Sequence, residues 1–415
     1  MKAERIRKRA LALLLLALLM LSGSLSAAAD FPADGLRVAV ASDLHFNPDD
    51  VKKGRDATAI QYNMELVDAL LWDAGQQGAK MILLTGDLVN GGKYPRHAAL
   101  AEKLRQAEKT GLDVYVVPGN HDLAPTTQME FAEFYAAFGY DEAYSRDAVS
   151  LSYCIVRDGL LLLMLDTGGY SVGAIDLADP PAHEDAFLSE ETLRWAETML
   201  QKAADEGLHV LCAGHYNLLP EISRQPGSGY CLQNGDRLAA LLRQYGAPLY
   251  LSGHMHLRAV YREDGLTELL TEYLLGYPTG YSLLDLTDGG IRYAPRRIDV
   301  ESWARQEGLK DRVLLDFADW QQDGLREYAE LNVAYMSEKN PLSRKEKEQA
   351  ADFFYAAMDA YWDGSLSDRR AELEAMPGYG PFFRCAEDYA YGWWLRDLIE
   401  TAVPELRGFT LAWQN

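Results

Sequence analysis

Five short motifs in this chain carry acidic, amide or imidazole side chains, the residue types that bind metal ions, and four of the five also contain glycine. They are Asp43-Leu44-His45, Gly86-Asp87, Gly119-Asn120-His121-Asp122, Gly214-His215 and Gly253-His254-Met255-His256, and they contain five of the eight histidines. In an extended chain, side chains two residues apart point the same way, so Asp43 and His45 can reach one cation. Asp, His and Asn suit zinc, iron or manganese, and the motifs therefore indicate a metal site.

Each motif alone also has an ordinary explanation, because Asp-x-His and Gly-Asp are common in turns and Gly-Asn-His-Asp could be a plain loop. Their positions are more informative, since each motif follows an apolar run that predicts a strand. The five runs are Leu36–Ser42, Met81–Thr85, Val114–Val117, Val210–Ala213 and Leu249–Ser252. Folds that mix strands and helices place their sites at the carboxyl edge of the sheet, where we expect these motifs to meet.

The chain between Leu36 and about Ile298 alternates short strands with helices. Apolar periodicity predicts a helix over Asp56–Gln76, and Ser189 can cap another that runs to about Ala204. Arg157-Asp158-Gly159 is typical of a hairpin turn. Further strands are expected near 266–275, 281–286 and 291–298. This alternation predicts an α/β fold with stacked layers over residues 30–300.

The pattern changes near Glu301, after which helical periodicity replaces the candidate strands. Ser343 and Glu346 form a capping box, and six of the eight tryptophans lie between residues 301 and 415. An aromatic stripe at helical spacing is usually core, and we favour a helical appendage that packs on the α/β domain. The alternative is that some of these rings cover a substrate pocket at the domain interface.

The ordered motifs resemble those of the calcineurin-like metallophosphoesterase superfamily, and the resemblance covers about residues 36–300. It implies a four-layer α/β/β/α sandwich that carries two divalent metal ions, Mn, Fe or Zn, at one edge. By the family pattern, the first metal would be held by Asp43, His45, Asp87 and His256. The second would be held by Asp87, Asn120, His215 and His254. Asp87 would bridge the two ions.

The resemblance also implies two catalytic residues. His121 would face the substrate and could protonate the leaving alkoxide, because imidazole has the right pKa range. Asp122 would orient that ring, although a turn-forming carboxylate explains Asp122 equally well. The metals would lower the pKa of bound water and clamp the phosphate, so that a metal-bound hydroxide attacks phosphorus.

Some residues depart from the family pattern or fall outside it. Asn90 stands where the purple acid phosphatases have a tyrosine ligand, so an iron–tyrosinate centre is not expected. His97 and His209 match no motif and are predicted to lie on the surface. His183 lies in a long stretch between Thr167 and Leu188, which could be a loop that covers the site.

The net charge and the first 29 residues indicate which partners and which cellular location to expect. The net charge is −22, which argues against a general nucleic-acid binder and against work on duplex DNA. Residues 1–9 carry +4, the apolar run Ala10–Leu21 is too short to span a membrane, and small residues follow. Residues 1–29 are therefore interpreted as a signal peptide, which leaves a mature chain of −26 without a transmembrane segment. We expect an exported protein, secreted or in the cell envelope.

These observations favour an exported, dinuclear metal-dependent phosphoesterase acting on a small-molecule phosphoester. Phosphodiesterase or nucleotidase activity on cyclic or linear nucleotides is a close alternative, and the sequence leaves monoesters, diesters and the oligomeric state open. A different class, a non-catalytic envelope module that binds metal or phosphate, is disfavoured because all seven ligand positions and His121 are filled. The four cysteines match no zinc motif, and no disulfide is predicted.

Overall fold

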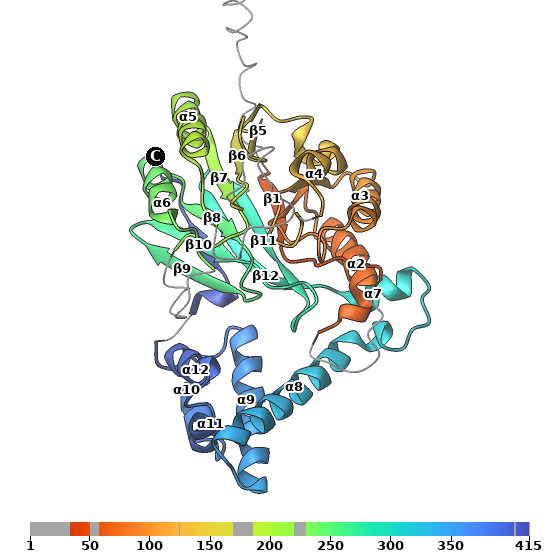
Figure 1. Ribbon diagram of the computed structural model, residues 1–415, viewed down its shortest axis with the longest axis vertical. Coiled ribbons are helices and arrows are strands. Elements are labelled where there is room, and N and C mark those ends of the chain that lie inside the picture. The colour runs from red at the N-terminus through yellow and green to blue at the C-terminus, as the bar shows by residue number, and fades with distance from the viewer. Residues whose placement is uncertain are drawn as a thin grey trace, which may run out of the picture.

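Two β-sheets packed face to face, with helices on both outer sides, form the larger part of the molecule (Figure 1). The computed structural model describes residues 34–49, 58–123, 125–168, 186–219, 230–401 and 404–414. The predicted signal peptide, residues 1–29, lies outside these described residues, as does His183. Among the described residues, no helix has the length and apolar character needed to cross a membrane.

The first sheet has six strands in the order β13–β12–β11–β1–β2–β3. The strands are β1 (Leu36–Ala41), β2 (Met81–Leu84), β3 (Asp113–Val116), β11 (Gly280–Thr287), β12 (Gly290–Arg297) and β13 (Phe409–Leu411). β1 pairs in parallel with β2 and antiparallel with β11, and β2 pairs in parallel with β3. The side chains of β1 are buried from Val38 to Ala41, which explains why this strand is apolar on both faces.

The second sheet has seven strands in the order β4–β5–β6–β7–β8–β10–β9. They are β4 (Ser145–Arg146), β5 (Tyr153–Arg157), β6 (Leu160–Met164), β7 (His209–Ala213), β8 (Leu249–Ser252), β9 (Ala259–Glu263) and β10 (Leu266–Leu270). Asp158 and Gly159 both have positive φ between β5 and β6, so the predicted hairpin turn is confirmed.

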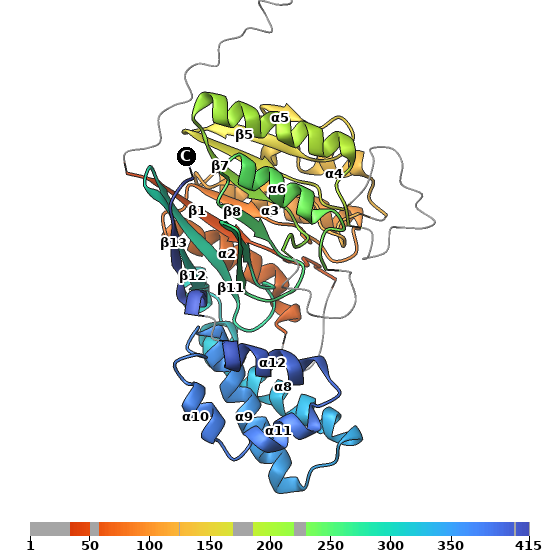
Figure 2. The ribbon, with the colours of Figure 1, turned by 90° about the vertical axis from the view of Figure 1, so that its left-hand side faces the viewer.

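Helices cover the two outer faces and complete the predicted α/β/β/α order. The helices α2 (Asn63–Gln76), α3 (Tyr94–Glu108), α4 (Gln128–Phe134) and α7 (Val300–Gln306) lie outside the first sheet (Figure 1). The helices α5 (Glu190–Glu206) and α6 (Gly235–Gln244) lie outside the second (Figure 2). Ser189 caps α5 through its side chain, as predicted.

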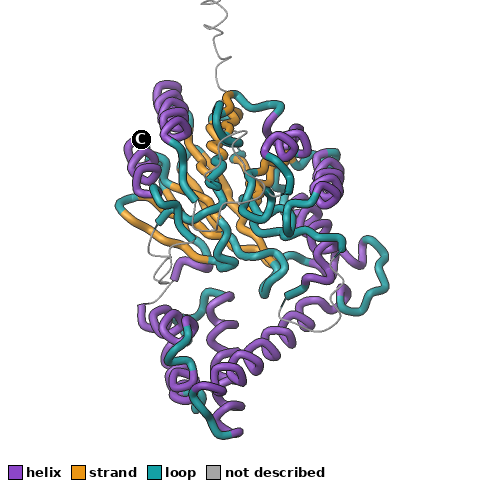
Figure 3. Tube along the Cα trace, viewed as in Figure 1, coloured by secondary structure: helices purple, strands orange, loops and turns teal. Residues whose placement is uncertain are grey.

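A helical region packs at one end of the sandwich, and Figure 3 shows that it consists of helices and loops. It contains α8 (Phe317–Lys339), α9 (Arg344–Trp362), α10 (Arg370–Ala375), α11 (Tyr379–Cys385) and α12 (Ala390–Thr401). The capping box of Ser343 and Glu346 begins α9, as predicted. Phe353, Phe354 and Phe382 are fully buried here, so much of the aromatic stripe is core.

The expectation of helices alone after residue 301 misses one strand. β13 pairs antiparallel with β12, with Phe409 opposite Tyr293 and Leu411 opposite Ile291 (Figure 2). Beyond it, the indole nitrogen of Trp413 donates to the carbonyl of Thr287 at 2.7 Å. The chain thus leaves the sandwich after β12, builds the helical region and returns to the first sheet.

Candidate metal centre

The five predicted motifs meet at one edge of the two sheets, just after β1, β2, β3, β7 and β8. Seven described non-glycine residues have positive φ, and five of them are predicted ligands. These five are Asp43, His45, Asp87, His254 and His256. Such backbone conformations are costly and concentrate at functional sites, where the surrounding structure holds them. The strand ends therefore hold these side chains in a strained, fixed arrangement.

Asp43, His45, Asp87 and His256 form one group whose possible ligand atoms all lie within 4.8 Å of one another. His256 Nε2 lies 3.3 Å from Asp43 Oδ1, and His45 Nε2 lies 3.4 Å from Asp87 Oδ2. The two imidazole nitrogens are 3.2 Å apart. This is the set that the family pattern places around the first metal.

Asp87, His215 and His254 form a second group that meets the same distance limit. His215 Nε2 lies 3.5 Å from Asp87 Oδ1 and 3.2 Å from His254 Nδ1. Asn120 joins them, because its Oδ1 lies 3.1 Å from the same His215 nitrogen. Asp87 belongs to both groups and contributes a different oxygen to each, which is the arrangement a bridging carboxylate needs.

Two further observations show that these residues fit a pair of cations. Asp43 Oδ1 is buried and accepts no hydrogen bond within the described part of the chain, and its nearest ring nitrogen, His256 Nε2 at 3.3 Å, is itself a candidate ligand. A cation between these two atoms would offset the cost of burying the carboxylate. His215 Nδ1 lies 2.8 Å from the carbonyl of Thr85. Since a carbonyl can only accept, Nδ1 carries the proton and Nε2 is left to bind a metal.

Mutual electrostatics keep the carboxylates of the centre ionised. Burial alone would raise the pKa of Asp43, but the neighbouring rings of His256 and His45 outweigh burial and hold that pKa well below its usual range. Burial is likewise outweighed at Asp87, whose pKa is lowered by the charge of His215. Burial would lower the pKa of His215, yet the charge of Asp87 raises it to about 9. Both carboxylates are thus held in the deprotonated form that a metal ligand requires.

Gly86 and Gly253 are among the motif glycines that close approach, and not turn geometry alone, requires. A Cβ on Gly86 would lie 2.6 Å from the ring nitrogen Nδ1 of His215, and Gly86 also has a φ of +95°. A Cβ on Gly253 would lie 2.5 Å from Asp43 Oδ2. A side chain at either position would displace a candidate ligand.

His121 lies beside the centre without belonging to either ligand group. Its Nε2 is 4.0 Å from Asp87 Oδ2, and its side chain is 37% exposed. Its backbone N–H donates to Asp87 Oδ1 at 2.8 Å, and its ring meets the His45 ring edge-on at 4.7 Å. At this position the imidazole can face a bound substrate.

Asp122 is fully buried, and backbone groups occupy both of its carboxylate oxygens. Oδ2 accepts from the N–H groups of Gly119 and Leu88, and Oδ1 accepts from Val89. Burial and the charge of Asp87 raise the pKa of Asp122 to about 7. These bonds tie the loop after β2 to the loop after β3, which fits the turn-forming alternative for Asp122.

Two residues near the centre are not what the sequence suggests. The prediction that His97 lies on the surface is wrong: His97 is completely buried, and its Nε2 lies 2.9 Å from the carbonyl of Asp122. Tyr273 was not singled out, yet its ring stacks on His256 at 4.5 Å and meets His45 edge-on. Tyr273 follows β10 at the same sheet edge as the motifs, and that position is the only sequence feature that could have identified it.

His209, the other residue expected at the surface, is half-buried and stacks on Trp413.

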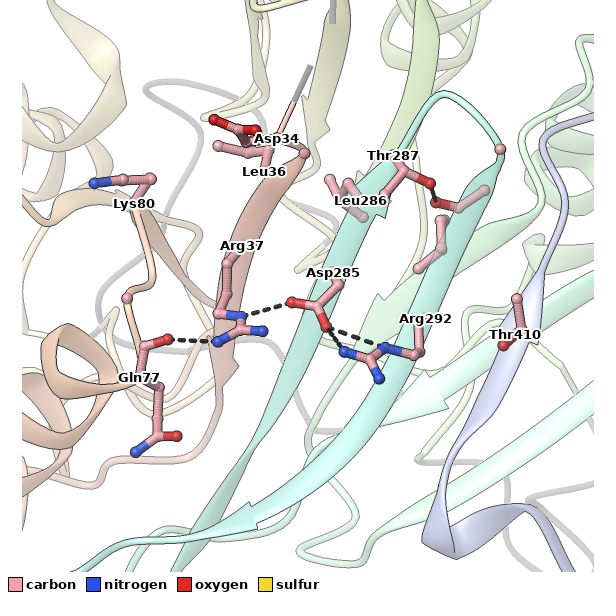
Figure 4. Close-up of a pocket in the computed structure, with 15 residues that line it drawn as sticks. Asp34, Leu36, Arg37, Gln77, Lys80, Asp285, Leu286, Thr287, Arg292 and Thr410 are labelled. Carbon is pink, nitrogen blue, oxygen red and sulfur yellow. Dashed lines mark hydrogen bonds and ion pairs between the residues drawn. The ribbon is translucent and has the colours of Figure 1, made fainter. Parts of the chain in front are cut away.

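Two pockets lie at opposite ends of β1. A pocket of about 450 Å³ includes His256 and is lined by both the sandwich and the helical region. A larger one of about 760 Å³ surrounds the start of β1, about 20 Å from Asp43 by strand length (Figure 4). There, Arg37 and Arg292 both pair with the single carboxylate of Asp285 (Figure 4). Only the first pocket adjoins the metal centre.

Comparison with known proteins agrees with this geometry. Residues 36–258 match the model of the family described as calcineurin-like phosphoesterase, and residues 299–398 match that of the C-terminal domain of cyclic nucleotide phosphodiesterase. A relative from Arcobacter nitrofigilis, named "probable glycerophosphodiester phosphodiesterase GpdQ", is 30% identical over 237 residues. That match covers 55% of this chain and 75% of the relative.

The fold is also shared with a solved structure of low sequence identity. The crystal structure of a dimetal phosphatase from Danio rerio superposes with a TM-score of 0.50 at 13% identity, over 64% of this chain and 96% of that one. At this identity the likeness concerns the fold alone. From its family match, this chain belongs to the calcineurin-like phosphoesterases and is a metal-dependent phosphoester hydrolase.

Proposed function

We propose that this chain is an exported phosphodiesterase that works with two divalent metal ions. The main support for two ions is the position of Asp87, because its two carboxylate oxygens face different groups of candidate ligands. One ion would be held by Asp43, His45, Asp87 and His256, and the other by Asp87, Asn120, His215 and His254. When bound, two such ions supply positive charge for the phosphate oxygens and lower the pKa of water.

The chain's own residues supply the remaining steps. Asp43 and Asp87 fix the centre because both are buried and ionised. His121 stands at its exposed side, and we assign to its Nε2 the proton that the leaving oxygen needs. Asp122 acts through the backbone by holding the loop that carries Asn120 and His121.

Four observations favour diesters over monoesters. The relative is named a phosphodiesterase, and the model that matches residues 299–398 describes a domain of a cyclic nucleotide phosphodiesterase. A diester also places a second substituent beside the metals, and the pocket next to His256 offers space for one. The described residues that line this pocket include no Lys or Arg, so it offers no cation for the additional charge of a monoester.

The test is turnover by the full chain loaded with manganese or zinc. We expect faster hydrolysis of bis(p-nitrophenyl) phosphate than of p-nitrophenyl phosphate. The Asp87→Asn protein should lose both metal and activity. The Asp285→Asn protein carries the same change at the other end of the strands, beside the start of β1, and should keep both. Faster monoester turnover would contradict the diester assignment, and no turnover of either compound would favour a metal-binding module.

Export is tested separately on the expressed protein. The proposal expects the recovered mature chain to begin just after residue 27, 28 or 29 and to lie outside the cytoplasm. N-terminal sequencing of fractionated cells measures this directly. An intact Met1 in the cytoplasmic fraction would contradict export without affecting the catalytic proposal.

A further inference from the structure

The pocket beside the metal centre is built jointly by the sandwich and the helical region. Met255, His256 and Tyr277 line it from the sandwich, and Tyr328, Trp362 and Trp394 line it from α8, α9 and α12. Its volume of about 450 Å³ lies within the range of small-molecule pockets. Sequence segments more than 100 residues apart therefore meet around one cavity.

His256 connects this pocket to the metal centre. Its Nε2 points to Asp43 Oδ1 at 3.3 Å, while its side chain stays 44% exposed and lines the pocket. Tyr273 stacks on the ring with an interplanar angle of 16° and so fixes its orientation. A group attached to a phosphate at the metal centre can extend past His256 into this pocket.

The chemistry of the walls defines what this group can be. Trp362, Trp394, Tyr328 and Met358 offer flat or apolar surfaces, and Trp394 packs edge-on against Tyr361 at 5.2 Å. The described lining residues include no Asp, Glu, Lys or Arg, and His256 is the one histidine among them. Such walls favour an uncharged, planar ring that stacks on indole or phenol. A small polyol such as glycerol would leave this aromatic surface in contact with water.

The helical wall of the pocket is fixed to the sandwich by buried polar contacts. Arg258, 3% exposed, donates through Nη1 to the carbonyl of Trp362 at 3.0 Å and through Nε to Glu272 at 3.1 Å. The hydroxyl of Tyr277 donates to Asp359 in α9 at 2.9 Å. These contacts hold Trp362 at a set distance from His256, so the pocket is preorganised.

We propose that this interdomain pocket is a specificity subsite that binds a ring-bearing, uncharged alcohol substituent of the phosphodiester, with a nucleobase-like ring against Trp394. The inference rests on the proposed phosphodiesterase function and adds the substrate class and the residues that select it. The helical region thus supplies half of the substrate site. The aromatic side chains of this region serve two purposes, since Phe353, Phe354 and Phe382 form its core.

The test compares two diesters that release the same p-nitrophenolate from metal-loaded protein. One is thymidine 5′-p-nitrophenyl phosphate and the other is methyl p-nitrophenyl phosphate, so only the retained substituent differs. We expect a higher kcat/KM for the thymidine ester, carried mainly by KM. Trp394→Ala should lower this preference about tenfold, the usual effect of losing a base-stacking ring.

Trp393→Ala is the matched control, because Trp393 is the neighbouring residue of α12 and lines a different surface depression. It should retain the preference for the thymidine ester. Trp394→Leu keeps an apolar side chain in the wall and replaces Trp394→Ala if that variant does not fold. In the native protein, thymidine alone should inhibit methyl ester hydrolysis competitively.

The outcomes separate the two proposals. If neither ester is hydrolysed, the phosphodiesterase function itself fails. If both are hydrolysed but the thymidine ester has no advantage, or the advantage survives in both Trp394 variants, the subsite is wrong and the function stands. Failure of thymidine to compete would likewise overturn the subsite.

Discussion

His121 is the residue whose chemistry separates catalysis from metal binding. It lies outside both ligand groups, and its side chain faces solvent beside Asp87. We expect His121→Ala to lower turnover about a hundredfold or more for an ester with an alkyl leaving group, because the departing alkoxide loses its proton donor. The loss should be much smaller for p-nitrophenolate, which departs as a stable anion. Steady-state kinetics on the two ester types measure the difference.

Metal analysis of the same variant provides the control. The metal content of His121→Ala should stay close to that of the unmodified protein. Loss of metal would show that His121 is a ligand, and equal losses for both leaving groups would remove its role as a proton donor.

His97 couples the stability of the site loops to pH. Its Nε2 donates to the carbonyl of Asp122 and its Nδ1 accepts from the hydroxyl of Tyr135, so the neutral ring is fully satisfied. Burial lowers the pKa of His97 to about 4, from an ordinary value of 6.5. The unfolded chain therefore binds more protons between these values, and the stability present above pH 6.5 is lost as pH falls toward 4.

The expected loss from this residue is about 2 kcal/mol between pH 7 and pH 5. It is measured by urea unfolding with a chelator present at both pH values, so that metal release does not contribute. His97→Gln keeps a donor toward Asp122 but cannot be protonated, and its stability should vary less over this interval. An unchanged pH dependence in His97→Gln would contradict this account.

For single residues, the sequence predicts a place in the site where the residue belongs to a recurring motif. It does not predict the place of a residue whose position depends on contacts with distant parts of the chain. Asp43, His45, Asp87, His254 and His256 are identifiable because each follows a predicted strand, and glycine precedes the last three in their motifs. His97 lies on an ordinary amphipathic helix, and nothing local shows that its ring reaches Asp122.

The element scale shows how helices and strands hold the site together. Arg258 and Glu272 are both almost completely buried, and Arg258 also binds the end of α9 through the carbonyl of Trp362. Arg258→Ala would leave the carboxylate of Glu272 buried without its cation. We expect a loss of roughly 3–5 kcal/mol in the free energy of unfolding, measured by urea denaturation.

A more exposed arginine–carboxylate pair provides the comparison. Arg292 is 67% exposed and pairs with Asp285, so Arg292→Ala should cost no more than about 1 kcal/mol. Replacing both Arg258 and Glu272 by methionine should recover much of the stability lost in Arg258→Ala. Equal effects of the two single substitutions would show that the buried pair does not hold the two parts together.

The strands were predicted to within a few residues where apolar runs are bounded by turn residues, as at β8 and β11. β10 ends at Leu270, earlier than the expected limit of 275, because the chain then turns and Tyr273 pairs with Ser42. β13 has three residues, too few to show an alternating pattern, and is formed because β12 offers it an edge.

At the scale of the whole molecule, the return of the chain to the first sheet should affect the stability of the fold but not the chemistry of the metal centre. The helical region is attached where the chain leaves β12 and again where β13 returns to the same sheet. β13 lies three strands from β1, or roughly 14 Å from the strand that carries Asp43. Phe409 and Trp413 bury most of their surface, and Trp413 stacks on His209 at 4.3 Å.

We therefore expect deletion of residues 409–415 to lower the melting temperature, since each buried ring contributes roughly 2 kcal/mol. Metal stoichiometry and turnover of the methyl ester should persist at temperatures where the shortened chain stays folded, because β12 and β11 lie between β13 and β1 in the sheet. Gln414→Ala removes only one exposed hydrogen bond, to the carbonyl of Gly265, and should leave the melting temperature close to normal.

An unchanged melting temperature after the deletion would show that the return strand adds little to the sheet. Loss of metal in the folded, shortened chain would show instead that removing the edge strand changes the positions of the metal ligands at β1.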